Sequence, residues 1–284
     1  METNLKNKKK LFLSLGLALV AALAIIIGSR FLLQGIGLRE TIKSNDILSE
    51  LFDTFKRIAL SVSILLVVKK IYDIKMGFTD KNLGKGLFIH GFLILIYTGL
   101  QFYSEYTKPE KSLLSVLPIV AIYLVANLCT GLFEEILCRG FLFNSFKEYF
   151  GDNKKGVFKA AFISSALFGA FHLLNLTGNP EYVVGTLTQV AYAFFFGIAF
   201  CAIYYLSGNI ISCIILHGIF DFSNKFWHLF IVERAESIEA TKAVDMTLGQ
   251  SATLLLIFVP MLICGLIQLH MAFKKKESVR ALAH

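Results

Sequence analysis

The 284-residue sequence has little of what a soluble chain needs, with 17% charged residues and four prolines against 27 phenylalanines. Mean hydropathy is +0.66. Soluble globular domains carry about 25% charged residues, so this balance excludes an ordinary soluble protein. Scarce proline and abundant phenylalanine favour long helices that face lipid. No segment leaves room for a soluble domain of any size.

The motifs of disulfide-rich proteins and of the best-known zinc proteases are also missing. All five cysteines lie in hydrophobic runs without a C-x-x-C pair, which makes them small apolar side chains. The H-E-x-x-H motif is absent, so any metal site would have to be assembled across helices. Low-complexity tracts and convincing internal repeats are absent as well.

The chain does contain a series of apolar runs. Each is close to the length of about 20 residues that a helix needs to cross a bilayer. The fold class predicted is all-α, a single polytopic membrane domain over residues 1–284. Its eight expected helices are 11–33, 51–72, 84–105, 112–149, 157–174, 184–206, 208–232 and 248–273. The first run is too long for the core of a cleaved signal peptide, so we expect it to remain as a helix.

Lysine and arginine placement indicates the orientation of these helices. Basic residues are concentrated before the first run, in two alternate loops and after the last run. By the positive-inside rule both termini are cytoplasmic, in a multi-pass protein of a cell membrane that we expect to be bacterial. The net charge of +8 is then explained by topology and by anionic lipid, with no nucleic acid as partner.

The most informative feature is a charged group inside the apolar run from Leu113 to Phe146. Glu134 and Glu135 are adjacent, and Arg139 follows Glu135 at the spacing of one helical turn. Glu135 and Arg139 can therefore form an ion pair, while Glu134 points about 100° away, toward neighbouring helices. A buried ion pair that only locks helix packing is the alternative. As one straight helix the run would be about 51 Å long against a core of about 30 Å, so it must tilt, break or emerge at the interface.

Two later apolar runs carry a histidine each. His172 follows Phe168 by four residues, and His217 precedes Asp221 by four. A carboxylate one turn from an imidazole can fix its tautomer or share in ligand binding. Taken alone, each histidine could also be a packing residue. Together, three acids and two histidines suit activation of a water and stabilisation of an oxyanion. They would also suit zinc, with Glu134, His172 and His217 as candidate ligands.

In order and spacing, the three motifs resemble those of the CAAX-protease and bacteriocin-processing family, whose members are eight-helix intramembrane proteases. The motif-bearing core covers about residues 113–225. The resemblance implies that Glu134 and His172 activate the attacking water, and that His217 and Asp221 lie near the oxyanion. Glu135, Arg139 and Phe168 would support the site, and Glu135 could take part directly. The family often has Asn where this chain has Asp221, which leaves open whether the side chain donates a hydrogen bond. Family members are described both as zinc enzymes and as metal-independent glutamate proteases.

The sequence thus predicts an intramembrane endopeptidase whose substrates are peptide precursors or membrane-protein termini. Two alternatives stay open. A non-catalytic immunity or scaffold protein could keep the fold and bind a peptide or partner. A proton-coupled transporter could use buried acids and histidines as a relay. The intact Glu134, His172 and His217 favour the protease.

Overall fold

The computed structural model describes residues 37–71, 76–177, 179–231 and 245–282, together with scattered positions between 9 and 35. The expected first helix, 11–33, and most of the loop at 233–247 lie outside the described ranges. Within those ranges the chain is helical and contains no strand, which confirms the all-α prediction.

The helices follow one another with short connections. In chain order they are α2 (Arg39–Lys43), α3 (Asp46–Ile71), η1 (Lys85–His90), α4 (Phe92–Ser104), α5 (Leu113–Glu135), η2 (Ile136–Phe143), α6 (Asn144–Phe150), α7 (Lys154–Phe171), η3 (His172–Thr177), α8 (Val183–Ser207), α9 (Ile210–Lys225), η4 (Trp227–Phe230) and α11 (Leu248–Leu282). The η1 and η2 segments are π-helices, whereas η3 and η4 are 3₁₀ turns.

Polar side chains fix where three of the main helices begin. Ser112, Asn153 and Asn209 cap α5, α7 and α9 by accepting a hydrogen bond from the backbone N–H three residues later. Between α8 and α9 the turn closes at Gly208, whose φ of 63° is left-handed and suits glycine. A tight turn at 207–209 therefore joins the two helices.

Seven of the eight expected helical segments are found in the described ranges, with altered ends. The helix expected at 51–72 begins earlier, at Asp46, and the last one continues to Leu282. The long run from Leu113 does not break: it changes from α to π geometry after Glu135 and returns to α-helix up to Phe150.

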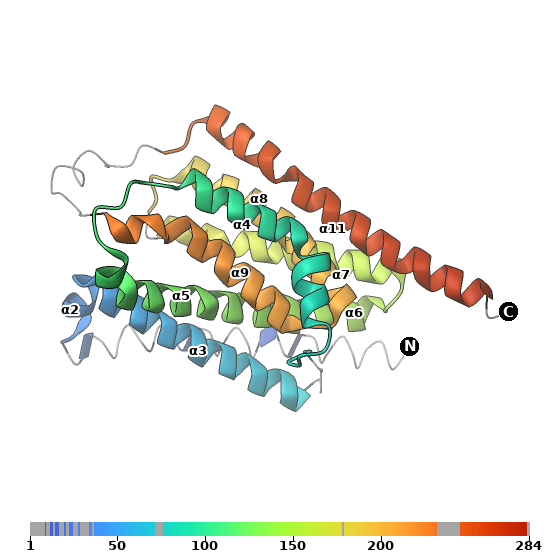
Figure 1. Cartoon of the computed structure of the whole chain (residues 1–284). Helices are drawn as coiled ribbons and strands as arrows, with labels where there is room; N and C mark the ends of the chain where they lie inside the picture. The colour runs from blue at the N-terminus through green and yellow to red at the C-terminus, as the bar shows by residue number, and fades with distance from the viewer. Residues whose placement is uncertain are drawn as a thin grey trace.

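The elements form a bundle in which sequence neighbours are not always the closest partners. Figure 1 shows α3 and α5 side by side along one edge and α11 along the opposite edge. Although a tight turn joins α8 to α9, α9 packs mainly against α5 and α4, and α8 packs mainly against α7 and α11. Because α9 contacts α5 and η2, and α7 contacts η2, the segments that carry the acidic and histidine motifs meet where α5 passes into η2.

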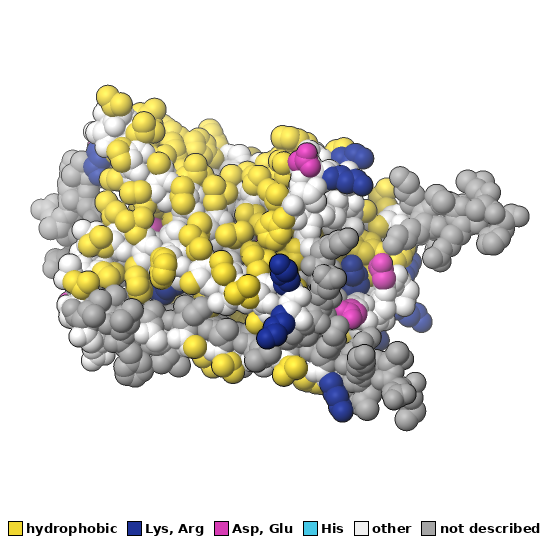
Figure 2. Space-filling model, turned by 90° about the horizontal axis from the view of Figure 1, so that it is seen from below, with side chains coloured by type: hydrophobic (Ala, Val, Ile, Leu, Met, Phe, Trp, Pro, Cys, Tyr) yellow, Lys and Arg dark blue, Asp and Glu magenta, His cyan; other side chains and the backbone are white. Residues whose placement is uncertain are grey.

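The outer surface is apolar over a wide area. In Figure 2 hydrophobic side chains cover the middle of one face, and the visible Lys, Arg, Asp and Glu residues gather mainly toward one end. Exposed large apolar side chains occur on several helices, among them Leu66, Leu114, Phe162 and Leu256. Four helical segments are long and apolar enough to cross a membrane: Leu113–Phe150, Lys154–Thr177, Val183–Ser207 and Leu248–Lys274. A soluble monomer does not tolerate such surfaces, so they face lipid. The count of eight spans remains a prediction.

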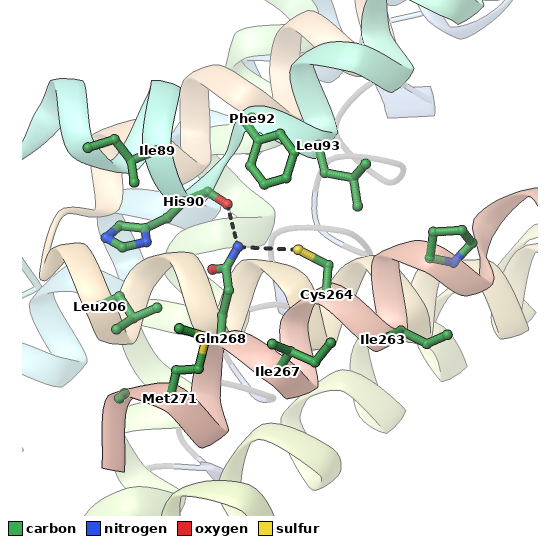
Figure 3. Close-up of a pocket in the computed structure, with 12 residues that line it drawn as sticks. Ile89, His90, Phe92, Leu93, Leu206, Ile263, Cys264, Ile267, Gln268 and Met271 are labelled. Carbon is green, nitrogen blue, oxygen red and sulfur yellow. Dashed lines mark hydrogen bonds between the residues drawn. The ribbon is translucent and has the colours of Figure 1, made fainter. Parts of the chain in front are cut away.

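A groove of about 770 Å³ opens between η1–α4 and α11 (Figure 3). Its lining is apolar apart from His90 and Gln268, whose amide Nε2 donates a hydrogen bond to the backbone oxygen of His90. None of the acidic or histidine motif residues lines this groove, so it is separate from the site described next.

Candidate active site

The site is built on the point where α5 becomes the π-helix η2. Glu135 is the last α-helical residue, and its Oε1 accepts a 2.9 Å hydrogen bond from Nη1 of Arg139. Both side chains are fully buried. A buried pair of this kind forms only if each charge is matched, because removing either charge from water alone costs several kcal/mol. The predicted ion pair is therefore confirmed.

Wider turns in η2 leave backbone carbonyls that need donors, and side chains from nearby supply them. The amide Nδ2 of Asn144 donates to the backbone oxygens of Arg139 and Gly140 and contacts the Tyr204 hydroxyl. Ser164 of α7 donates to the backbone oxygen of Cys138. Segments of π-helix are uncommon and often mark functional sites, and here the segment directly follows the two acids.

His217 joins α9 to this pair. Its Nδ1 lies 2.8 Å from the same Oε1 of Glu135 that pairs with Arg139, and the ring is buried. Two glycines permit the approach: a Cβ on Gly131 of α5 would lie 2.7 Å from the Ile214 backbone oxygen, and one on Gly218 of α9 would lie 2.8 Å from the Leu128 Cα. Neither distance is tolerable, so the absence of both side chains sets the spacing of the two helices.

The other nitrogen of His217 faces two half-buried acids. Nε2 lies 3.4 Å from Oε2 of Glu134 and 3.6 Å from Oδ2 of Asp221. These two carboxyl side chains are 26% and 31% exposed, whereas Glu135 is completely enclosed. The three acids thus divide into one buried partner that orients the imidazole and two accessible ones at its opposite edge.

Aromatic rings enclose the cluster. Phe200 of α8 stacks on the His217 ring at 5.3 Å and 20°, and it also lies 4.9 Å from the Arg139 guanidinium carbon. Phe168 of α7 approaches the same carbon at 4.6 Å. Rings on both helices therefore replace the water that would otherwise surround the cation. This shell holds Arg139 in place without offering a competing acceptor.

His172 reaches the cluster through Phe168. It caps the C-terminus of α7, and its Nδ1 lies 3.1 Å from the backbone oxygen of Phe168, which leaves Nε2 as the nitrogen open to other partners. The Phe168 ring makes edge contacts with both imidazoles, 5.3 Å from His172 and 5.9 Å from His217. Both predicted histidines therefore border one space, with Phe168 between them.

All seven site residues predicted from the sequence belong to this assembly, with one change of partner. The spacing of His217 and Asp221 suggested that Asp221 could fix the imidazole tautomer, but Glu135 occupies Nδ1 and Asp221 lies at Nε2. The sequence analysis missed Phe200 and the pair Gly131 and Gly218. A phenylalanine in an apolar helix carries no signal of its own, and the glycines matter only once α5 and α9 are known to touch.

Zinc ligation by Glu134, His172 and His217 stays a prediction from the donor types. Among the described residues no set of three His, Cys, Asp or Glu side chains is placed to hold a metal ion. Nδ1 of His217 lies on Glu135 and Nδ1 of His172 on the Phe168 backbone, which leaves Nε2 of each ring as the nitrogen that a metal or a water could use. All five cysteines are free, and Cys138 is buried next to Arg139 in the sequence.

Comparison with known proteins agrees with the motifs. Residues 116–223 match the family model described as Type II CAAX prenyl endopeptidase Rce1-like, a range that contains α5 from its first turn, η2, α6, α7, α8 and nearly all of α9. Every residue of the acid and histidine cluster lies inside the match. No curated protein and no solved structure gave a significant match.

Proposed function

Because residues 116–223 match a family of CAAX-type proteases, we propose that this chain is an intramembrane endopeptidase. Glu134 and His172 activate the water that attacks the peptide bond in this proposal. The observation that carries it is the convergence of Glu134 and Asp221 on Nε2 of His217, with Nδ1 held by Glu135. If the polar residues served only helix packing, the buried pair of Glu135 and Arg139 would be sufficient. Two further, accessible acids at His217 would add nothing to that role.

The first step is attack of the water oxygen on the carbonyl carbon. Glu134 takes the water proton as general base, and Nε2 of His172 orients the water or shares that proton. The carbonyl oxygen becomes an oxyanion, which accepts a hydrogen bond from Nε2–H of His217 in its doubly protonated, cationic form, whose Nδ1–H is donated to Glu135. In the second step the carbon–nitrogen bond breaks, and the proton held by Glu134 moves to the departing amine. One product ends in a new carboxyl group and the other begins with a new amine.

Glu135 and Arg139 are positioning residues in this mechanism. Glu135 accepts the Nδ1 hydrogen of His217, so Nε2 faces the reacting carbonyl, and Arg139 neutralises the buried carboxylate.

Zinc stays a prediction from the donor types. Metal analysis of the purified protein, with activity measured before and after chelation, tests it.

Substrates are expected among peptide precursors and membrane-protein termini, because the site lies inside a bundle with a lipid-facing surface. The test compares peptides and membrane-protein termini from cells that carry wild-type protein, Glu134→Gln or Glu148→Gln at matched levels. Glu148 is exposed on α6, so its substitution makes the same chemical change outside the site. New termini in the wild type and in Glu148→Gln, but not in Glu134→Gln, support proteolysis and identify the substrate. Identical termini in all three strains contradict it.

A further inference from the structure

A cation outside the three motifs lies on the inner face of α3. The buried side of this helix is Thr54, Leu60, Ser61, Ile64 and Val68, and Arg57 falls on the same stripe, half-buried. Positive charge within a helix that is expected to span lipid is costly, so it usually faces a polar cavity or a ligand.

The side chain of Arg57 has one hydrogen-bond partner within the described residues. Its Nη1 lies 3.1 Å from Oε1 of Glu50, two turns earlier on the same helix, with side-chain exposures of 26% and 17%. A guanidinium carries five N–H donors in a planar fork, and a single contact to one carboxylate oxygen leaves most of them unused.

This side chain lies on the buried side of α3, a helix that packs against α5, which carries the proposed catalytic acid. Helix α3 packs against α5 and η2, and the Arg57 charge interacts electrostatically with both Cys129 and Glu134 of α5. Arg57 therefore lies beside the stretch of α5 that leads to the acid and histidine cluster. No motif residue comes from α3, so Arg57 adds a charged group from a further helix that contacts α5 and η2.

We propose that Arg57 binds a carboxylate of the peptide substrate and so makes the enzyme prefer substrates with a negative charge near the scissile bond. The inference rests on the proposed protease function. A carboxylate matches the guanidinium fork in shape and charge, and it is the anionic group of an unmodified peptide. It can be the C-terminal carboxylate or the side chain of Asp or Glu, and it would replace or share the contact with Glu50.

The alternative is that Glu50 and Arg57 form an ion pair that only stabilises α3. The two roles differ in what they predict for Glu50→Gln. If Arg57 binds substrate, losing its internal competitor strengthens retention of acidic peptides. If the pair is structural, Glu50→Gln lowers the stability of the fold, and the protein retains acidic and neutral peptides equally.

Peptide retention separates these roles without requiring hydrolysis. The full chain, carrying Glu134→Gln to prevent turnover, is immobilised in nanodiscs and exposed to a synthetic peptide pool of defined length and mixed sequence. The pool is made in three forms: with free C-terminal carboxylates, with C-terminal amides, and with amides plus Asn and Gln in place of Asp and Glu. Retained peptides are quantified by mass spectrometry. Arg57→Gln and Glu50→Gln are compared with Lys56→Gln, which removes one positive charge at the neighbouring position, where Lys56 pairs with Asp53.

We expect the unaltered Arg57 protein to favour carboxylate-bearing peptides roughly tenfold or more, as loss of a charged hydrogen bond implies. Arg57→Gln abolishes the preference, Glu50→Gln increases it and Lys56→Gln leaves it unchanged. The two amidated forms show whether the group is terminal or a side chain.

Equal retention of all three forms overturns the proposal. So does a preference that survives Arg57→Gln. If Arg57→Gln does not fold, a preference that Glu50→Gln leaves unchanged or lowers overturns it. Clear retention without cleavage by the Glu134-containing protein would leave this inference standing and contradict the protease function instead.

Discussion

At the scale of single residues, Glu135 is the acid that joins Arg139 to His217. Its Oε1 bonds both Arg139 and His217, and its side chain has no exposure. An amide in its place can accept through one oxygen only and carries no charge, so Arg139 would stay buried without a counter-ion.

We therefore predict that Glu135→Gln lowers the free energy of unfolding by roughly 3–5 kcal/mol, the cost of breaking a buried ion pair from one side. Denaturant titration in mixed micelles measures this, with Glu148→Gln as the control of matched chemistry. A loss of less than about 1 kcal/mol, the worth of a surface pair, would mean that the Arg139 charge is compensated elsewhere.

Asp221 and His217 should differ sharply in their tolerance of substitution. Oδ2 of Asp221 is 3.6 Å from the imidazole, too far for a direct hydrogen bond, so Asp221→Asn is expected to keep most of the cleavage rate. His217→Gln removes the proposed oxyanion donor and should lower kcat by about a hundredfold or more. Steady-state kinetics of cleavage of the identified substrate measures kcat for both variants and for the wild type. An inactive Asp221→Asn with an unchanged Tm would show that the carboxylate itself is required.

At the scale of elements, the contact between α5 and α9 determines whether the acids and histidines meet. It depends on Gly131 and Gly218, where an added Cβ would overlap the backbone of the facing helix. The helices can separate only by moving His217 away from Glu135.

Gly218→Ala is expected to lower cleavage roughly a hundredfold, because a displacement of about 1 Å in a reacting group has that effect. Stability should fall by about 1–3 kcal/mol from overpacking. Gly99→Ala in α4, where a Cβ meets no atom within 4 Å, is the control. Full activity in Gly218→Ala would show that the site tolerates wider spacing than the structure has.

A second contact between elements gives a pH dependence. Asp245, before α11, accepts hydrogen bonds from the backbone N–H groups of Val184 and Gly185 at the start of α8, and from that of Met246. Desolvation is the largest single influence and acts to raise the pKa of Asp245, but the backbone N–H groups together outweigh it and hold the pKa below its usual value. A lowered pKa stabilises the fold above the pKa of the unfolded chain, about 3.9, and the stabilisation disappears as pH falls through the folded value.

The Tm of wild type should accordingly exceed that of Asp245→Ala at neutral pH, and the two should converge as the pH falls below about 4. Thermal unfolding of both proteins across pH measures the gap. A gap that is constant with pH would assign the contact to packing rather than to charge.

At the scale of the whole molecule, the sequence predicted the helical class and the approximate helices, and the structure places the predicted site residues near one another. Periodicity and the length of apolar runs are local properties of the sequence, so the helices could be predicted from the sequence alone. The π-helix after Glu135 and the pairing of α9 with α5 were not predicted, because both depend on contacts between distant segments. The sequence analysis also did not single out Arg57, a cation that lies on the same side of α3 as its buried residues.

Orientation in the membrane also belongs to this scale. Basic residues follow the last helix, where Lys274, Lys275 and Lys276 are consecutive. We predict a cytoplasmic C-terminus, so a C-terminal green fluorescent protein fusion should fluoresce and a C-terminal alkaline phosphatase fusion should be inactive. The reverse pattern would invert the topology and with it the side from which substrate enters.

The central claim is that Glu134 drives hydrolysis of a peptide bond inside the bundle. Its most direct test is incubation of the purified protein in nanodiscs with candidate peptides in ¹⁸O-labelled water, followed by mass spectrometry. Hydrolysis predicts new C-terminal carboxylates that carry the label in wild type and in Glu148→Gln but not in Glu134→Gln. Labelled termini formed equally by Glu134→Gln, or no cleavage of a peptide that the wild-type protein binds, would contradict the account.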